Sequence, residues 1–175
     1  MSLIEKIKSL PNKQKLYYFA FLIGFGVVLN LGETFIPKPL PFLRIGLAKI
    51  SLLIVVYAFS FWYVFIFPVL RCFISNFLTG TILTPLFLWS LAGSLGSAIV
   101  MFIISHSFLN RYFSIYGTSI IGALTNNIIQ WSLIVVIFNF YYYTMLPIIL
   151  ILSIITGCLI AYITNYISIR YEKYM

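Results

Sequence analysis

Polar side chains that could bind a ligand stand inside apolar stretches of this chain. They are Arg71, Asn126, Asn127 and Gln130. Such groups cost free energy in hydrocarbon, about 3 kcal/mol for an arginine at the centre of a bilayer, so they face a protein interior instead. Guanidinium pairs with carboxylate or phosphate, and amides both donate and accept hydrogen bonds. We therefore expect a polar, mainly cationic interior that binds a small molecule.

Further charged residues extend this set along the chain. Arg44, Lys49 and Arg71 together could hold an anionic group, which the amides would orient. Glu33 is the acidic residue nearest to them in the sequence. Two interpretations of Glu33 stay open. It lies beside the pocket, or it forms an interfacial ion pair with one of the cations that follow it, Lys38, Arg44 or Lys49.

The three amides belong to one predicted helix. Ser119, Ala123, Asn126 and Gln130 recur at i, i+4, i+7 and i+11, which places them on one face, and Asn127 flanks that face. Hydrogen bonds between membrane helices are one explanation for such amides. A ligand-facing role is the other, and three amides within five residues favour it. The predicted pocket consists of Glu33, Arg44, Lys49, Arg71, Asn126, Asn127 and Gln130.

The elements that must position these residues are transmembrane helices. Hydrophobic residues make up 62% of the chain and charged residues 8%, whereas soluble domains carry about 25% charged residues. Segments near the length of about 20 residues that spans a bilayer occur at 15–34, 46–60, 62–80, 85–106, 113–138 and 145–170. We predict an all-α, multi-pass protein of the bacterial cytoplasmic membrane, with one six-helix bundle over residues 15–175. Residues 1–14 form an amphipathic cytoplasmic or interfacial lead-in.

Topology explains most of the net charge of +8. With an even number of helices, the cations that precede the first helix, follow the fourth and follow the sixth lie on one side of the membrane. These cations are Lys6, Lys8, Lys13, Lys15, Arg111, Arg170 and Lys173. The positive-inside rule makes that side cytoplasmic, so we expect both termini there. No basic stripe on a soluble surface is predicted, which argues against a nucleic-acid partner.

Small residues mark the first long helix. Ala20 and Gly24 are four residues apart, a spacing that lets another helix approach closely. Packing inside the bundle is one explanation of this pair. The other is a docking site for a partner membrane subunit.

The sequence gives little support for enzymatic chemistry. The chain contains no aspartate and three glutamates, whereas a prenyl or phosphoryl transferase needs clustered carboxylates to hold magnesium. Its single histidine, His106, falls at a predicted helix end. No P-loop is present, so ATP would have to be used by partner subunits. We expect a non-enzymatic protein without a metal or cofactor of its own.

Three segments carry a family resemblance. The first runs from Pro41 to Ile50, the second contains Phe77-Leu78-Thr79-Gly80-Thr81, Pro85 and Ser90-Leu91-Ala92-Gly93, and the third contains Gly117-Thr118-Ser119-Ile120-Ile121-Gly122-Ala123 followed by Asn127 and Gln130. In this order they resemble the Gx transporter, or heptaprenyl diphosphate synthase component I, family over residues 16–170. Two positions depart from the family pattern: Lys49 stands where the family usually has asparagine, and Asn126 where it often has histidine.

That family is similar to the substrate-binding S components of energy-coupling factor (ECF) transporters. The resemblance implies a six-helix bundle with a pocket open to the outside, and docking through Ala20 and Gly24 on a coupling subunit that carries two ATPases. An isoprenoid, a quinone precursor, a flavin or another vitamin-like compound would fit as the substrate for uptake. Two alternatives stay open: a non-catalytic membrane subunit that supports isoprenoid or quinone biosynthesis or a flavin redox system, and a structural scaffold.

Overall fold

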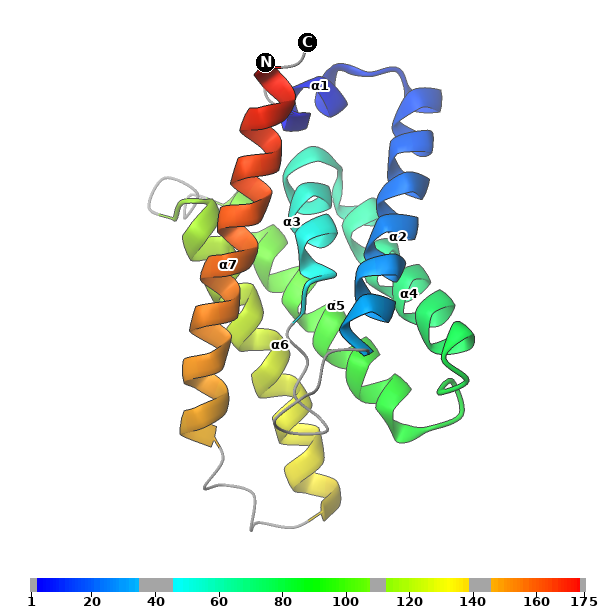
Figure 1. The fold of residues 1–175 in the computed structure, drawn as a ribbon, viewed down its shortest axis with the longest axis vertical. Helices are drawn as coiled ribbons and strands as arrows, with labels where there is room; N and C mark the ends of the chain where they lie inside the picture. The colour runs from blue at the N-terminus through cyan, green and yellow to red at the C-terminus, as the bar shows by residue number, and fades with distance from the viewer. Residues whose placement is uncertain (1–2, 35–45, 108–112, 139–145, 174–175) are drawn as a thin grey trace.

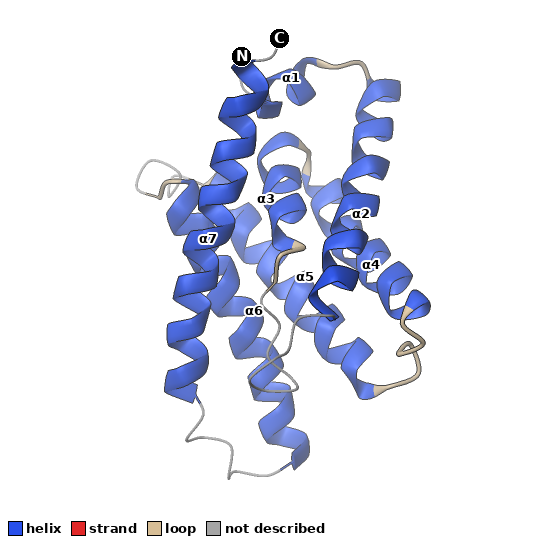
Figure 2. Ribbon diagram, in the orientation of Figure 1, coloured by secondary structure: helices blue, strands red, loops and turns tan. Residues whose placement is uncertain are grey.

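The protein folds as a bundle of helices. The structure, a computed structural model, describes residues 3–34, 46–107, 113–138 and 146–173. All regular elements in these ranges are helical (Figure 2). They are α1 (Leu3–Ser9), α2 (Asn12–Thr34), α3 (Lys49–Ala58), α4 (Phe61–Leu78), α5 (Pro85–His106), α6 (Ile115–Phe138) and α7 (Leu146–Lys173).

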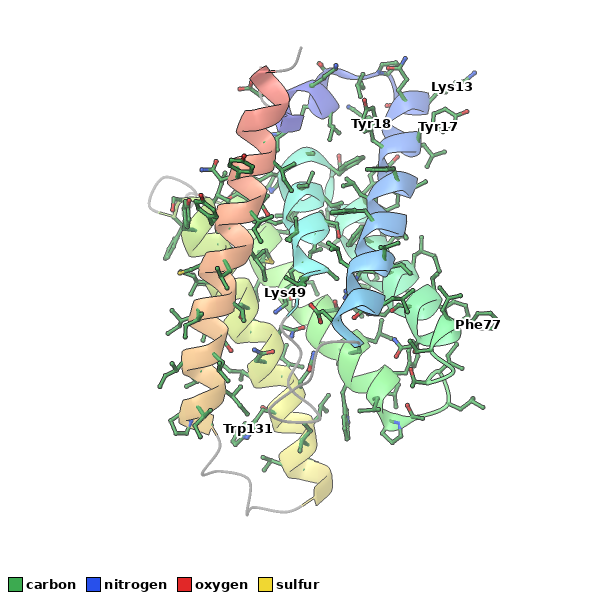
Figure 3. All side chains as sticks on the ribbon, viewed as in Figure 1. Lys13, Tyr17, Tyr18, Lys49, Phe77 and Trp131 are labelled. Atoms are coloured by element: carbon green, nitrogen blue, oxygen red, sulfur yellow. The ribbon has the colours of Figure 1, made fainter. Side chains whose placement is uncertain are left out.

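Helices α2, α4, α5, α6 and α7 are long and apolar enough to cross a membrane. They correspond to five of the six predicted spans, with ends that differ by at most a few residues. Large apolar side chains cover their outer surface; Tyr17 on α2 and Phe77 on α4, for example, are 76% and 66% exposed and point away from the bundle (Figure 3). Such a continuous apolar surface is suited to lipid. The chain is therefore a multi-pass membrane protein, and its described elements are all helices.

The sixth predicted span, residues 46–60, is not confirmed. In its place lies α3, which has 10 residues and is therefore about 15 Å long, half of a hydrocarbon core of about 30 Å. Nine of its residues are buried. Its length alone therefore does not confirm a sixth span, and neighbouring helices of the bundle enclose most of it.

Local signals explain where several helices begin and end. Ser60 is extended between α3 and α4, which separates two apolar segments that have almost no polar linker. Gly80, with φ +68°, turns the chain after α4, and Pro85 occupies the first turn of α5, where its missing N–H is not needed. The predicted helix boundaries at Ser60 and Pro85 are confirmed.

The short helix α3 lies at the centre of the bundle. It contacts α1, α2, α4, α5 and α7, and most of its apolar side chains belong to the main hydrophobic core. Helices α5, α6 and α7 pack against one another in chain order. Helix α1 lies across one end, with its Ile7 buried, and the end of α7 lies at that same end (Figure 1). The first residue of α3, Lys49, therefore points away from the end of the bundle that carries both termini.

Candidate functional site

A polar pocket lies at the N-terminal end of α3, where α2, α4, α5 and α6 also meet. Its volume is about 20 Å³, which is room for little more than one water molecule. The residues that line it are Asn30, Glu33, Gly46, Ala48, Lys49, Arg71, Ser90, Ser94, Asn126 and Gln130. Because α3 is so short, the pocket lies in the interior of the bundle, and Figure 3 shows Lys49 there.

Arg71 contributes one side of the pocket from α4. It is 7% exposed. Its Nη2 donates to Ser94 Oγ on α5 and, at 3.4 Å, to Cys72 Sγ. Its Nε is buried and has no hydrogen-bond partner in the described part of the chain. Nη2 of the guanidinium is therefore held by protein, whereas Nε has no partner among the described residues.

Lys49 faces the same pocket from the first turn of α3. It is 5% exposed, and its Nζ also lacks a hydrogen-bond partner among the described residues. Its side chain folds over Gly46, where an added Cβ would lie 3.3 Å from Nζ. Gly46 has φ +84°, a backbone conformation that favours glycine. Glycine at this position thus permits both the turn before α3 and the placement of the lysine.

Glu33 connects the end of α2 to the start of α3. Its Oε1 accepts a hydrogen bond from the Leu47 N–H, and it is almost completely buried. A carboxylate at the start of a helix also compensates the positive end of the helix dipole. With Glu33, Lys49 and Arg71 all ionised, two cations and one carboxylate leave one excess positive charge among the described pocket residues.

The predicted amide cluster divides between two neighbours. Asn126 and Gln130 pack against Gly93 of α5, where an added Cβ would lie 2.9 Å from Asn126 Oδ1 and 2.8 Å from Gln130 Cγ. Asn127 faces α7 instead: its Nδ2 donates to Ser153 Oγ at 2.7 Å, and its Oδ1 accepts from Asn126 Nδ2 at 3.1 Å. For Asn127 the structure therefore has the interhelical hydrogen bond that was one of the two explanations.

Five of the seven predicted site residues come together in the pocket, namely Glu33, Lys49, Arg71, Asn126 and Gln130. Arg44 lies outside the described residues. Sequence reasoning missed the smaller polar members, Asn30, Ser90 and Ser94. Their spacing could have revealed them, because Asn30 precedes Glu33 by three residues, and Ser90 and Ser94 are four apart, so each pair shares a helix face.

The predicted docking residues lie elsewhere, on the outer surface of α2. Ala20 and Gly24 are both exposed, and an added Cβ at Gly24 would meet no atom within 4 Å. Their neighbours Tyr17 and Phe21 are also strongly exposed. This small-residue pair therefore does not serve packing within the described bundle.

A comparison with known protein families shows to which family the chain belongs. The sequence model described as heptaprenyl diphosphate synthase component I matches residues 22–167. The chain belongs to the heptaprenyl diphosphate synthase component I family. The matched range contains every described residue of the pocket, so the pocket belongs to the part of the chain that defines the family. No curated protein and no solved structure matches the chain.

Proposed function

We propose that this protein is a substrate-binding membrane component, like the S components of ECF transporters, that captures a small anionic molecule from the outer face for uptake driven by a separate ATPase module. One observation carries the proposal: two buried cationic donors, Lys49 Nζ and Arg71 Nε, line one pocket without hydrogen-bond partners among the described residues.

The cost of burying these charges supports a ligand. Taking an ion out of water costs several kcal/mol even after the protein relaxes, and a buried donor without an acceptor adds a further about 1–3 kcal/mol. A purely structural scaffold would be expected to satisfy such groups internally, as Asn127 does through Ser153. An anion that accepts from both Lys49 and Arg71 offsets the cost only while it is bound.

The position of the pocket supports capture from the outer side. Lys49 begins α3 at the end of that helix that points away from α1 and from the end of α7 (Figure 1). If the termini are cytoplasmic, as the distribution of cations predicts, the pocket faces the outside. The N-terminus of a helix that begins within the membrane is also the positive end of its dipole, which favours an anionic group.

The outer surface of α2 supports a partner for transport. The chain has no P-loop, so the energy for uptake must come from another subunit. Ala20 and Gly24 present a flat, exposed strip, and such small residues let a second helix approach closely in a bilayer. We assign the docking of a transmembrane coupling subunit to this strip.

The family description favours a second candidate, a membrane subunit that assists a heptaprenyl diphosphate synthase. In that case this chain would be non-catalytic, since three glutamates and no aspartate in the whole sequence leave little to hold the magnesium that prenyl transfer needs.

Affinity purification from native membranes in mild detergent separates the two candidates. We expect a transmembrane coupling subunit and ATPases to co-purify in defined stoichiometry with the tagged chain. A soluble prenyl synthase in their place would favour the second candidate and overturn the transport proposal.

A further inference from the structure

The pocket also restricts the chemistry of its ligand. We infer that the head group bound there is a single carboxylate of a small polar acid, and not a diphosphate or the end of a prenyl chain. This inference rests on the proposed function, because it names the class of anion that the same pocket takes.

The net charge of the pocket favours a single carboxylate. Lys49 and Arg71 oppose Glu33, so the described pocket residues carry one excess positive charge when all three are ionised. One carboxylate cancels that charge. A diphosphate carries several negative charges, and the surplus would lie beside the buried Glu33 in a site of low dielectric constant. Like charges repel strongly there, so a carboxylate is favoured over a diphosphate.

The two buried nitrogen atoms without partners also favour a carboxylate. Arg71 Nη2 donates to Ser94 and Cys72, whereas Arg71 Nε and Lys49 Nζ are buried without a hydrogen-bond partner among the described residues. Two donors of this kind match the two oxygens of a carboxylate. A diphosphate has more anionic oxygens than these two cationic nitrogen atoms, so the charge on its remaining oxygens would face neutral amides and hydroxyls in the pocket.

Volume and lining restrict the rest of the ligand. The cavity of about 20 Å³ has room for little more than one water molecule, which is much closer to the size of a carboxylate than to that of a diphosphate. Apart from Gly46 and Ala48, all of its described lining residues are polar. A prenyl chain needs apolar walls, whereas the amides of Asn126 and Gln130 suit a hydroxyl or amino group next to the carboxylate.

Thermal unfolding of the purified protein in nanodiscs tests the inference with defined probes. Sodium acetate, lactate and pyruvate are the monocarboxylates, lactamide is an uncharged analogue of lactate, and sodium chloride controls for ionic strength. Inorganic pyrophosphate and geranyl diphosphate represent the excluded class. We expect at least one monocarboxylate to raise the Tm, and lactamide, chloride and both diphosphates to leave it unchanged.

Matched variants assign any shift to the pocket. Lys49→Met keeps most of the length of the side chain and removes its charge. It should fold with an unchanged or higher Tm without ligand, because an apolar group avoids the desolvation cost. The shift with carboxylate should disappear. Lys13→Met, at an exposed lysine of α2 (Figure 3), should keep the full shift. Arg71→Leu replaces Lys49→Met if that variant does not fold.

Two results would overturn the inference, and they differ in what they leave standing. A Lys49-dependent shift with pyrophosphate, geranyl diphosphate or chloride in place of the carboxylates refutes the carboxylate and keeps the capture of an anion. No Lys49-dependent shift with any of these anions refutes the carboxylate and also the proposed function.

Discussion

Lys49 depends on its neighbour Gly46 for its position in the pocket. Gly46 has φ +84°, and the Lys49 side chain lies directly over it, so an added Cβ would be 3.2 Å from Lys49 Cε. Gly80 has a similar conformation, φ +68°, but an added Cβ there would meet nothing within 4 Å. Both glycines therefore adopt a positive φ, but only Gly46 has the Lys49 side chain packed against it.

Gly46→Ala and Gly80→Ala separate backbone strain from the site. Both changes should lower the free energy of unfolding by about 1–2 kcal/mol, the cost of a side chain in the left-handed region. Only Gly46→Ala should also weaken anion binding, because its methyl group displaces Lys49. Thermal unfolding and isothermal titration with the best anionic probe measure the two effects. Equal affinities in the two variants would contradict the role given to Gly46.

Some pocket residues could be predicted from the sequence alone, and others could not. Arg71, Asn126 and Gln130 were predictable as pocket residues because each is polar within an apolar run. Asn127 was not separable from Asn126 by the same argument. Consecutive residues of a helix point about 100° apart, and only the packing of α6 shows that Asn127 faces Ser153 of α7 while Asn126 faces α5.

At the scale of elements, α3 determines the site. Its apolar sequence predicted a helix correctly, but not that the helix is 10 residues long and enclosed by protein. The distinction depends on neighbours contributed by distant parts of the chain, and no local pattern contains that information. Because α3 is only half as long as a span, it begins inside the bundle. Helices α2 and α4 place Glu33 and Arg71 beside its first turn.

Close packing of α2 on α3 and α4 holds this arrangement together. An added Cβ at Gly26 would lie 2.6 Å from Ser51 Oγ on α3 and 3.1 Å from Arg71 Cδ on α4, whereas Gly24, two residues earlier, faces open space. Gly26→Ala should therefore destabilise the protein by about 1–3 kcal/mol, the usual cost of overpacking.

Gly24→Ala is the matched control on the same helix. It should be neutral or stabilising by up to about 1 kcal/mol, because alanine is the better helix former. Thermal unfolding of both variants in detergent checks the difference. Equal stability of Gly26→Ala and Gly24→Ala would contradict the close packing of α2 against α3 and α4 at Gly26.

For the whole molecule, the sequence correctly predicted a bundle of long apolar helices. Five apolar segments coincide with the long helices, because length and apolar composition are sufficient signals for a membrane span. The start of α1 and the end of α7 share one end of the bundle (Figure 1); that this end is cytoplasmic stays a prediction. The outer surface of α2 is not explained by packing within the bundle, because Gly24 in the Ala20–Gly24 strip contacts no other described helix.

Enlarging that strip tests docking without disturbing the pocket. Gly24→Leu should abolish co-purification of the coupling subunit, because a branched side chain prevents the close approach of a second helix. Its Tm and its anion-dependent shift should stay at the wild-type values. Val136→Leu, at a position of α6 that is 81% exposed, is the control and should keep the partner. Retention of the partner by both variants would refute docking at Gly24.

Native mass spectrometry of the purified protein, together with identification of what co-purifies, shows directly whether the buried cations Lys49 and Arg71 hold an anion. We expect one small anion per chain in the wild-type protein, and its loss in a folded Lys49→Met variant. Lipid alone, in equal amounts in both proteins, would contradict this expectation and leave the two buried charges without a ligand to explain them.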